Sequence, residues 1–154
     1  MIFVALGTQD KSFKRLLDIV ESLNTDEKII VQAGFTKYTS SKLEIHDYFS
    51  KDEYMKLMNE ASLIICHGGV GTILNALSLN KKIIVVPRLK KYKEHQNDHQ
   101  LQVARVFNNE HHIILFKDGD DINSLYNKSK DFKPIPFVSN KNNFISKLKA
   151  YLEL

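Results

Sequence analysis

The sequence lacks the features that define several large classes of protein. Cys66 is its only cysteine, which excludes a scaffold stapled by disulfides. No apolar run approaches the roughly 20 residues that a membrane-spanning helix requires. Residues 1–4 carry neither the basic region nor the small-residue cleavage site of a signal peptide. We therefore expect a cytoplasmic protein.

Tryptophan is absent, and the net charge of +4 is small. The six Tyr and nine Phe residues do not have the spacing of an RNA-stacking module. The excess of 22 basic over 18 acidic residues favours anionic ligands such as phosphates. It is too small to indicate nucleic acid, and we expect no nucleic acid partner.

The chain alternates short apolar runs with segments of helical period. It has no internal repeat, low-complexity tract or long linker, which predicts one domain over residues 1–154. The predicted strands lie at 2–6, 29–31, 63–66, 83–86 and 113–115, with a weaker one at 43–48. Strands that are apolar on both faces and alternate with helices predict an α/β fold, a Rossmann-like parallel sheet with helices on both faces.

After the last strand, we predict an extended segment over residues 130–139. A final helix follows it, and its apolar face carries Phe144, Ile145, Leu148 and Leu152.

Three loops form the candidate ligand site, because ligands of open parallel sheets bind at the carboxyl ends of the strands. The first loop is Gly7-Thr8-Gln9, after the first strand. The second covers residues 67–72 and the third covers residues 88–100.

The second loop contains Gly68, Gly69 and Gly71, three of the six glycines in the chain. Glycines between a strand and a helix let backbone amides approach an anion, and the helix dipole favours a phosphate or diphosphate there. His67 can donate a further hydrogen bond to the same anion. A tight turn that needs glycine for its own geometry is the alternative. The spacing matches neither the dinucleotide fingerprint nor the P-loop.

The third loop is polar. Residues 94–100 offer carboxylate, imidazole and amide groups, which suit sugar hydroxyls because each hydroxyl both donates and accepts. Composition alone favours a solvated loop before a helix capped by Asn97 or Asp98. The basic residues at 88–93 are interpreted first as solvated, and otherwise as a surface for an acidic sugar or an anionic membrane.

Other chemical groups carry less weight. His95 and His99 lack the pattern of a zinc site, and residues 118–120 fit a turn and helix cap, so we predict no metal site. Cys66 ends an apolar run and fits a packed thiol better than a nucleophile.

In order, the chain carries H-G-G-x-G-T at 67–72, a helix, a V-V-P strand ending at Pro87 and D-x-Q at 98–100. This order resembles the C-terminal, donor-binding lobe of the GT-B glycosyltransferases, and more narrowly glycosyltransferase family 28. Residues 2–9 are similar to the start of that lobe, so the resemblance extends over essentially the whole chain.

Within the family, the chain most resembles the PssE-like small subunits of two-component bacterial capsule and exopolysaccharide transferases. These are similar to the catalytic subunit of the eukaryotic transferase that adds the second N-acetylglucosamine to a dolichol-linked sugar.

The resemblance implies a role for each matching residue. The residues that would border or hold the diphosphate of a UDP-sugar are Gly7, Thr8, Gln9, His67, Gly68, Gly69, Gly71 and Thr72. Those that would contact the hydroxyls of the donor sugar are Asp98, His99 and Gln100. Many relatives bind the ribose through an acidic residue on the following helix. This chain has Asn75 there, which can bond a hydroxyl but without charge-assisted strength.

The family further implies inverting transfer from a UDP-sugar to a polyprenyl-diphosphate-linked saccharide. His67 would be the catalytic residue, which neutralises charge on the departing UDP. We expect no cofactor and no metal ion. A two-lobed enzyme needs two domains of roughly 100–200 residues each, so we expect a membrane-attached partner subunit. This partner would supply the other lobe, the lipid-linked acceptor and the general base, and would hold the chain at the inner membrane face.

Three alternatives stay open. One is a non-catalytic accessory subunit that stabilises the partner transferase. Another is a nucleotide-binding or flavodoxin-like domain of unrelated function. The third is a UDP-sugar 2-epimerase, against which the short chain argues because that chemistry also needs two lobes.

Overall fold

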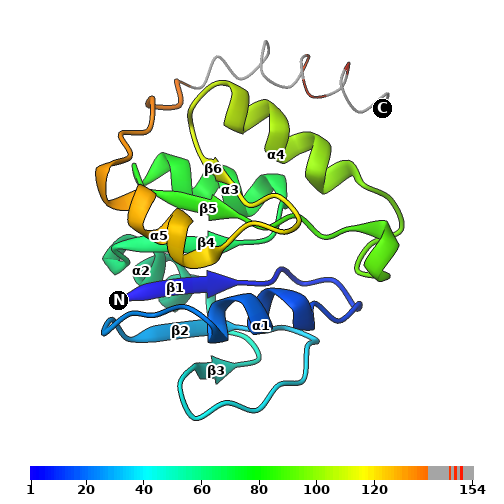
Figure 1. Ribbon diagram of the computed structural model, residues 1–154, viewed down its shortest axis with the longest axis vertical. Coiled ribbons are helices and arrows are strands. Elements are labelled where there is room, and N and C mark those ends of the chain that lie inside the picture. Colours follow the sequence, from blue (N-terminus) through cyan, green and yellow to red (C-terminus); the bar gives the residue numbers. More distant parts are fainter. Residues whose placement is uncertain (139–145, 147, 149, 151–154) are drawn as a thin grey trace.

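Six strands form a single parallel sheet in the order β3-β2-β1-β4-β5-β6 (Figure 1). A computed structural model describes residues 1–138 together with positions 146, 148 and 150. The strands are β1 (Ile2–Ala5), β2 (Ile29–Gln32), β3 (Glu44–His46), β4 (Leu63–Cys66), β5 (Ile83–Val85) and β6 (Ile114–Leu115). The predicted parallel α/β fold is confirmed.

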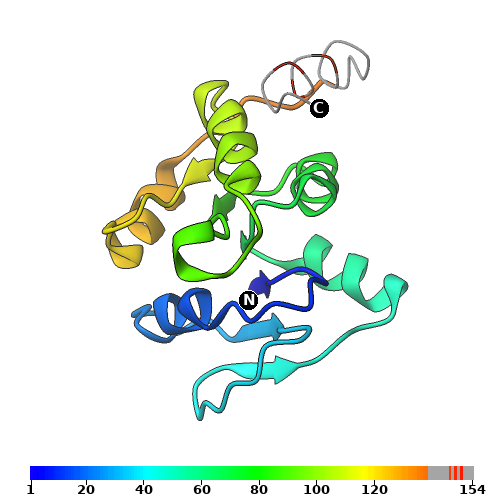
Figure 2. The same cartoon turned by 90° about the vertical axis from the view of Figure 1, so that its right-hand side faces the viewer.

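Helices cover both faces of this sheet. Those with described bounds are α1 (Lys14–Glu21), α2 (Lys51–Glu60), α3 (Val70–Ser78), α4 (His99–Asn109) and α5 (Ile122–Asp131). Helices α1 and α5 lie on one side of the sheet, and α2, α3 and α4 lie on the other (Figure 2). Their buried apolar side chains belong to the two core clusters on these faces. No helix in the described part of the chain is both long and apolar enough to cross a bilayer.

The central strands are buried on both sides, as their continuous apolar runs predict. Ile2 and Val4 of β1 face the α1 side, whereas Phe3 and Ala5 face the α2 side. All four side chains are at most 1% exposed. The edge strand β3 is different, because Glu44 and His46 are exposed, which explains its weak hydrophobic signal.

The end of the described chain differs from the prediction in one place. Helix α5 runs through Asp131, so the extended segment covers 132–138 rather than beginning at residue 130. Its Ile135 N–H donates to the His111 carbonyl oxygen at 2.9 Å. Of the predicted final helix, Phe144, Ile145 and Leu152 lie outside the described residues, and Leu148 is buried in the core on the α4 side.

Candidate functional site

The carboxyl ends of β1 and β4 border a crevice of about 430 Å³. The strand order reverses between these two strands, and open α/β sheets bind ligands at such a switch point. The described residues that line it are Gly7, Thr8, Gln32, Tyr48, Phe49, Lys51, Tyr54, His67, Gly69, Gly71 and Thr72. The first two predicted loops therefore meet in one place.

The sequence-based prediction missed the side of the crevice that follows β2 and β3. Tyr48 lies there with 57% of its surface exposed, and Lys51 and Tyr54 come from the start of α2. The Gln32 side-chain oxygen accepts from the Phe49 N–H at 2.8 Å, which ties the end of β2 to this loop. The carboxyl-end rule could have identified this side of the crevice, because Tyr48 ends the weaker predicted strand at 43–48 and residues 49–50 follow it.

Internal packing explains three of the glycines. A Cβ on Gly7, whose φ is +85°, or on Gly69 would lie 2.6 or 2.3 Å from His67 Cε1. A Cβ on Gly68 would lie 2.7 Å from the Gln100 carbonyl oxygen. A Cβ on Gly71 would meet nothing within 4 Å. The tight-turn interpretation therefore accounts for Gly68 and Gly69, where a side chain would clash with neighbouring atoms. At Gly71 a side chain would clash with nothing, so this glycine keeps the crevice open there.

We expect Gly69→Ala to lower the free energy of unfolding by about 1–3 kcal/mol, because the new methyl group overlaps the buried His67 ring. Gly71→Ala is the matched control. It should raise that free energy by up to about 1 kcal/mol, since alanine is the better residue inside α3. Urea unfolding followed by circular dichroism measures both variants. Equal effects at the two positions would contradict the packing described here.

His67 lies at the centre of the site and is only 7% exposed. Its Nδ1 is 3.1 Å from Gln100 Nε2, and its Nε2 is 3.2 Å from Thr72 Oγ1. Burial, followed by the nearby positive charge of Arg88, lowers the pKa of His67 to about 3. The ring is therefore a neutral imidazole at physiological pH.

Thr72 extends this contact, because its side chain also forms a hydrogen bond with the hydroxyl of Tyr54. Burial raises the pKa of Tyr54 to about 12, so the phenol stays protonated. The crevice wall thus presents neutral hydrogen-bonding groups beside the exposed Lys51.

The third loop is anchored by buried charge, which corrects the interpretation of residues 88–93 as solvated. Arg88 is 1% exposed. Its guanidinium donates to the carbonyl oxygens of Leu6 and Lys11, both at 2.7 Å, and of Glu94 at 3.2 Å. Arg88 therefore joins the first loop to the third. Lys90, Lys91 and Lys93 are exposed, as predicted.

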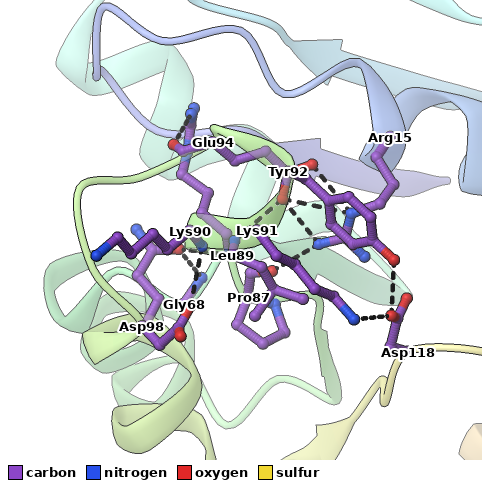
Figure 3. Close-up of polar contacts among 12 residues, drawn as sticks. Arg15, Gly68, Pro87, Leu89, Lys90, Lys91, Tyr92, Glu94, Asp98 and Asp118 are labelled. Carbon is purple, nitrogen blue, oxygen red and sulfur yellow. Dashed lines mark hydrogen bonds and ion pairs between the residues drawn. The ribbon is translucent and has the colours of Figure 1, made fainter.

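Glu94 provides a second anchor for the third loop (Figure 3). It is 4% exposed and pairs with Arg15 of α1 at 2.9 Å. The same carboxylate accepts from the Leu89 N–H at 3.0 Å. On the loop's outer side, Lys91 and the Tyr92 hydroxyl both bond Asp118.

The predicted sugar contacts are not brought together. Asp98 is exposed, its Oδ1 accepts from the Lys90 N–H at 2.9 Å, and it lines a separate cleft of about 510 Å³ beside α4 and β6. Asn97 accepts from the N–H of the half-buried His99, so it bonds the first residue of α4. Gln100 is buried beneath the crevice, where both ends of its amide bond other parts of the chain.

Three more predicted residues, Gly68, Gln9 and Asn75, lie outside the described lining of the crevice, and Gly68 is buried. Gln9 is half-buried in the first loop, and Asn75 is exposed on α3. Near residues 118–120, Asp121 caps α5 by accepting from the Asn123 N–H, and Asp120 accepts from the Lys117 N–H. The predicted turn at residues 118–120 is confirmed, but the helix cap is Asp121, one residue after that segment.

A parallel sheet of this order, with a glycine-bordered crevice at its switch point, defines a Rossmann-like α/β lobe. Residues 1–147 match the C-terminal domain of glycosyltransferase family 28, and the chain belongs to this family.

Relatives with curated names lie in bacteria and in yeasts. Over 124 residues, the chain is 30% identical to the UDP-N-acetylglucosamine--N-acetylmuramyl-(pentapeptide) pyrophosphoryl-undecaprenol N-acetylglucosamine transferase of Clostridium botulinum, covering 80% of this chain and 30% of that protein. Over 125 residues, it is 28% identical to the UDP-N-acetylglucosamine transferase subunit ALG13 of Yarrowia lipolytica, covering 71% of this chain and 62% of that subunit. This chain therefore spans less than two thirds of either relative.

Solved structures share the fold. The solution structure of ALG13 superposes with a TM-score of 0.61 at 22% identity, covering 96% of this chain and 94% of that one. The crystal structure of MurG from Acinetobacter baumannii superposes with a TM-score of 0.55 at 20% identity, covering 83% of this chain and 41% of that one.

Proposed function

We propose that this chain is the donor-binding subunit of a UDP-sugar-dependent glycosyltransferase in lipid-linked glycan synthesis. The crevice between the ends of β1 and β4 carries the proposal. It sits in a family 28 domain, at the position where such sheets bind nucleotides. The names of the bacterial and yeast relatives, both of them UDP-N-acetylglucosamine transferases, support a UDP-sugar as the donor.

The chemistry of the crevice suits a departing nucleoside diphosphate. The amino end of α3 begins at Val70, immediately after the glycine loop, and its free amides and dipole favour negative charge. The neutral His67 adds a hydrogen-bond donor, because a neutral imidazole still carries one N–H group. Lys51 adds a positive charge, and the exposed Tyr48 ring offers a flat surface for a base. Donors fixed in this way stabilise charge that develops on the leaving group.

We infer that the acceptor side of the reaction lies on a second subunit, because the yeast relative is named a transferase subunit. The chain spans only 30% of the bacterial transferase. We infer that a membrane-attached partner subunit supplies the acceptor lobe and the general base, and holds this chain at the inner membrane face. The acceptor would be a saccharide on a polyprenyl diphosphate. The sugar would be transferred to it with inversion of the anomeric configuration. Within this scheme, we favour the PssE-like subunits of capsule and exopolysaccharide synthesis, on the motif resemblance given above.

Calorimetric titration of the purified chain with UDP tests the donor-binding role. ADP and flavin mononucleotide are the control ligands. We expect UDP to bind and the controls to bind at least tenfold more weakly. Preferential binding of ADP or flavin mononucleotide would instead support an unrelated nucleotide-binding domain. Failure to bind UDP, in a chain that still forms a complex with a partner transferase, would support the accessory-subunit alternative.

A further inference from the structure

Gln100, near the start of α4, has a side chain whose orientation is fixed by its partners. Its Oε1 accepts from the backbone N–H of Gly68 at 2.9 Å and from the backbone N–H of Arg88 at 3.0 Å. Backbone N–H groups only donate, so the atom between them must be the amide oxygen. The Gln100 NH₂ group is therefore the one that faces His67 Nδ1, at 3.1 Å.

This orientation determines where His67 carries its proton. An amide NH₂ can only donate, so Nδ1 must accept and is unprotonated. In a neutral imidazole the proton is then on Nε2, which lies 3.2 Å from Thr72 Oγ1 on the crevice wall. Thr72 in turn bonds the hydroxyl of Tyr54. From Gln100 through His67 to Thr72, both hydrogen bonds run in one direction, toward the crevice.

We propose that Gln100 is a positioning residue that fixes the Nε2–H tautomer of His67, so that the ring presents a donor to the anionic group in the crevice. This inference rests on the proposed function and deepens it. The opposite tautomer would direct a lone pair at the anion, and repulsion would replace a hydrogen bond. Gln100 thus acts through His67 from beneath the crevice, where it is 6% exposed.

The charges around His67 keep the ring neutral. Arg88 and His95 lie close enough to lower its pKa, in addition to burial. Lys51 and Tyr54 line the crevice beside it. A neutral imidazole has one N–H proton. The nitrogen that carries it donates a hydrogen bond, and the other nitrogen accepts one.

The test is nitrogen NMR of the isotope-labelled full chain, because the ring nitrogens report the tautomer directly. In the wild type we expect protonated Nε2 and bare Nδ1 across about pH 5 to 8. Gln100→Glu should reverse this. One carboxylate oxygen still accepts from Gly68 and Arg88, but the other now requires a proton on His67 Nδ1. The pKa of the ring should then rise by more than one unit, and affinity for UDP should fall at least tenfold.

Gln96→Glu is the matched control, because it adds the same charge to an exposed position of the third loop. It should leave the tautomer of His67 unchanged. A wild-type ring protonated at Nδ1 would overturn the proposal, and this measurement needs no variant. An unchanged tautomer in folded Gln100→Glu would overturn it as well. If the tautomer is as expected and the chain binds no UDP, the proposed function fails and the assignment of Gln100 to the tautomer holds.

Discussion

Arg88→Met is expected to lower the free energy of unfolding by about 3–5 kcal/mol. Methionine fills a similar volume but donates no hydrogen bond. The carbonyl oxygens of Leu6 and Glu94 would then be buried without the donor that Arg88 supplies at 2.7 and 3.2 Å. Burial lowers the pKa of Arg88, but the guanidinium stays charged because its ordinary pKa is so high. Urea unfolding followed by circular dichroism measures the loss.

Arg105→Met is the matched control for this experiment. Arg105 is exposed on α4, and its replacement should change the free energy of unfolding by no more than about 0.5 kcal/mol. Arg88→Lys should recover only part of the loss, because an ammonium cannot reach several carbonyl groups as a planar fork does. If Arg88→Met unfolds at the wild-type urea concentration, the buried guanidinium does not hold the loops together.

His67→Ala is expected to lower turnover by about 10²–10³-fold in the complex with the acceptor-binding subunit. The variant loses the imidazole that contacts Gln100 and Thr72 and offers an Nε2 donor at the crevice. We also expect affinity of the isolated chain for UDP to fall at least tenfold. Calorimetry measures the affinity, and release of UDP from the sugar donor measures the turnover.

His111→Asn is the control for general effects of histidine replacement. His111 is exposed at the end of α4 with φ +60°, a conformation that asparagine tolerates. This variant should keep wild-type turnover. His67→Gln restores an amide donor near the position of Nε2 and should recover part of the activity that His67→Ala loses. Wild-type turnover in His67→Ala would exclude a role for this histidine in the reaction.

The sheet was predictable because its central strands are buried on both faces. In a chain that also shows helical periods, an unbroken apolar run such as residues 2–6 indicates a strand of a parallel sheet covered by helices on both faces. The carboxyl-end rule then located Gly7 and His67 on the same edge, and the structure places both in one crevice. The edge strand β3 has a weaker apolar pattern because its side chains are partly exposed. The prediction therefore did not include Tyr48, which follows this strand, among the site residues.

The hydrogen bonds of Arg88 and Gln100 could not be predicted from composition. A basic residue in a polar loop is usually solvated, and only the folded chain shows that Arg88 reaches Leu6, 82 positions away. Gln100 was predicted as a sugar contact because of its place in the motif. Its bonds to Gly68 and His67 join residues 32 and 33 positions apart, and local sequence does not specify such pairs. Asp98 likewise carries the motif but borders the other cleft.

The buried links made by Arg88 and Gln100 have a consequence for folding. The three loops come from distant parts of the chain, and they acquire their geometry only when β1, β4 and β5 have assembled. A chain that is only partly folded therefore has no complete crevice. A ligand that binds only the native state stabilises it by mass action, so nucleotide in the cell would also favour complete folding of this domain. If the crevice binds nucleotide as proposed, its occupancy and the folding of the sheet are linked equilibria.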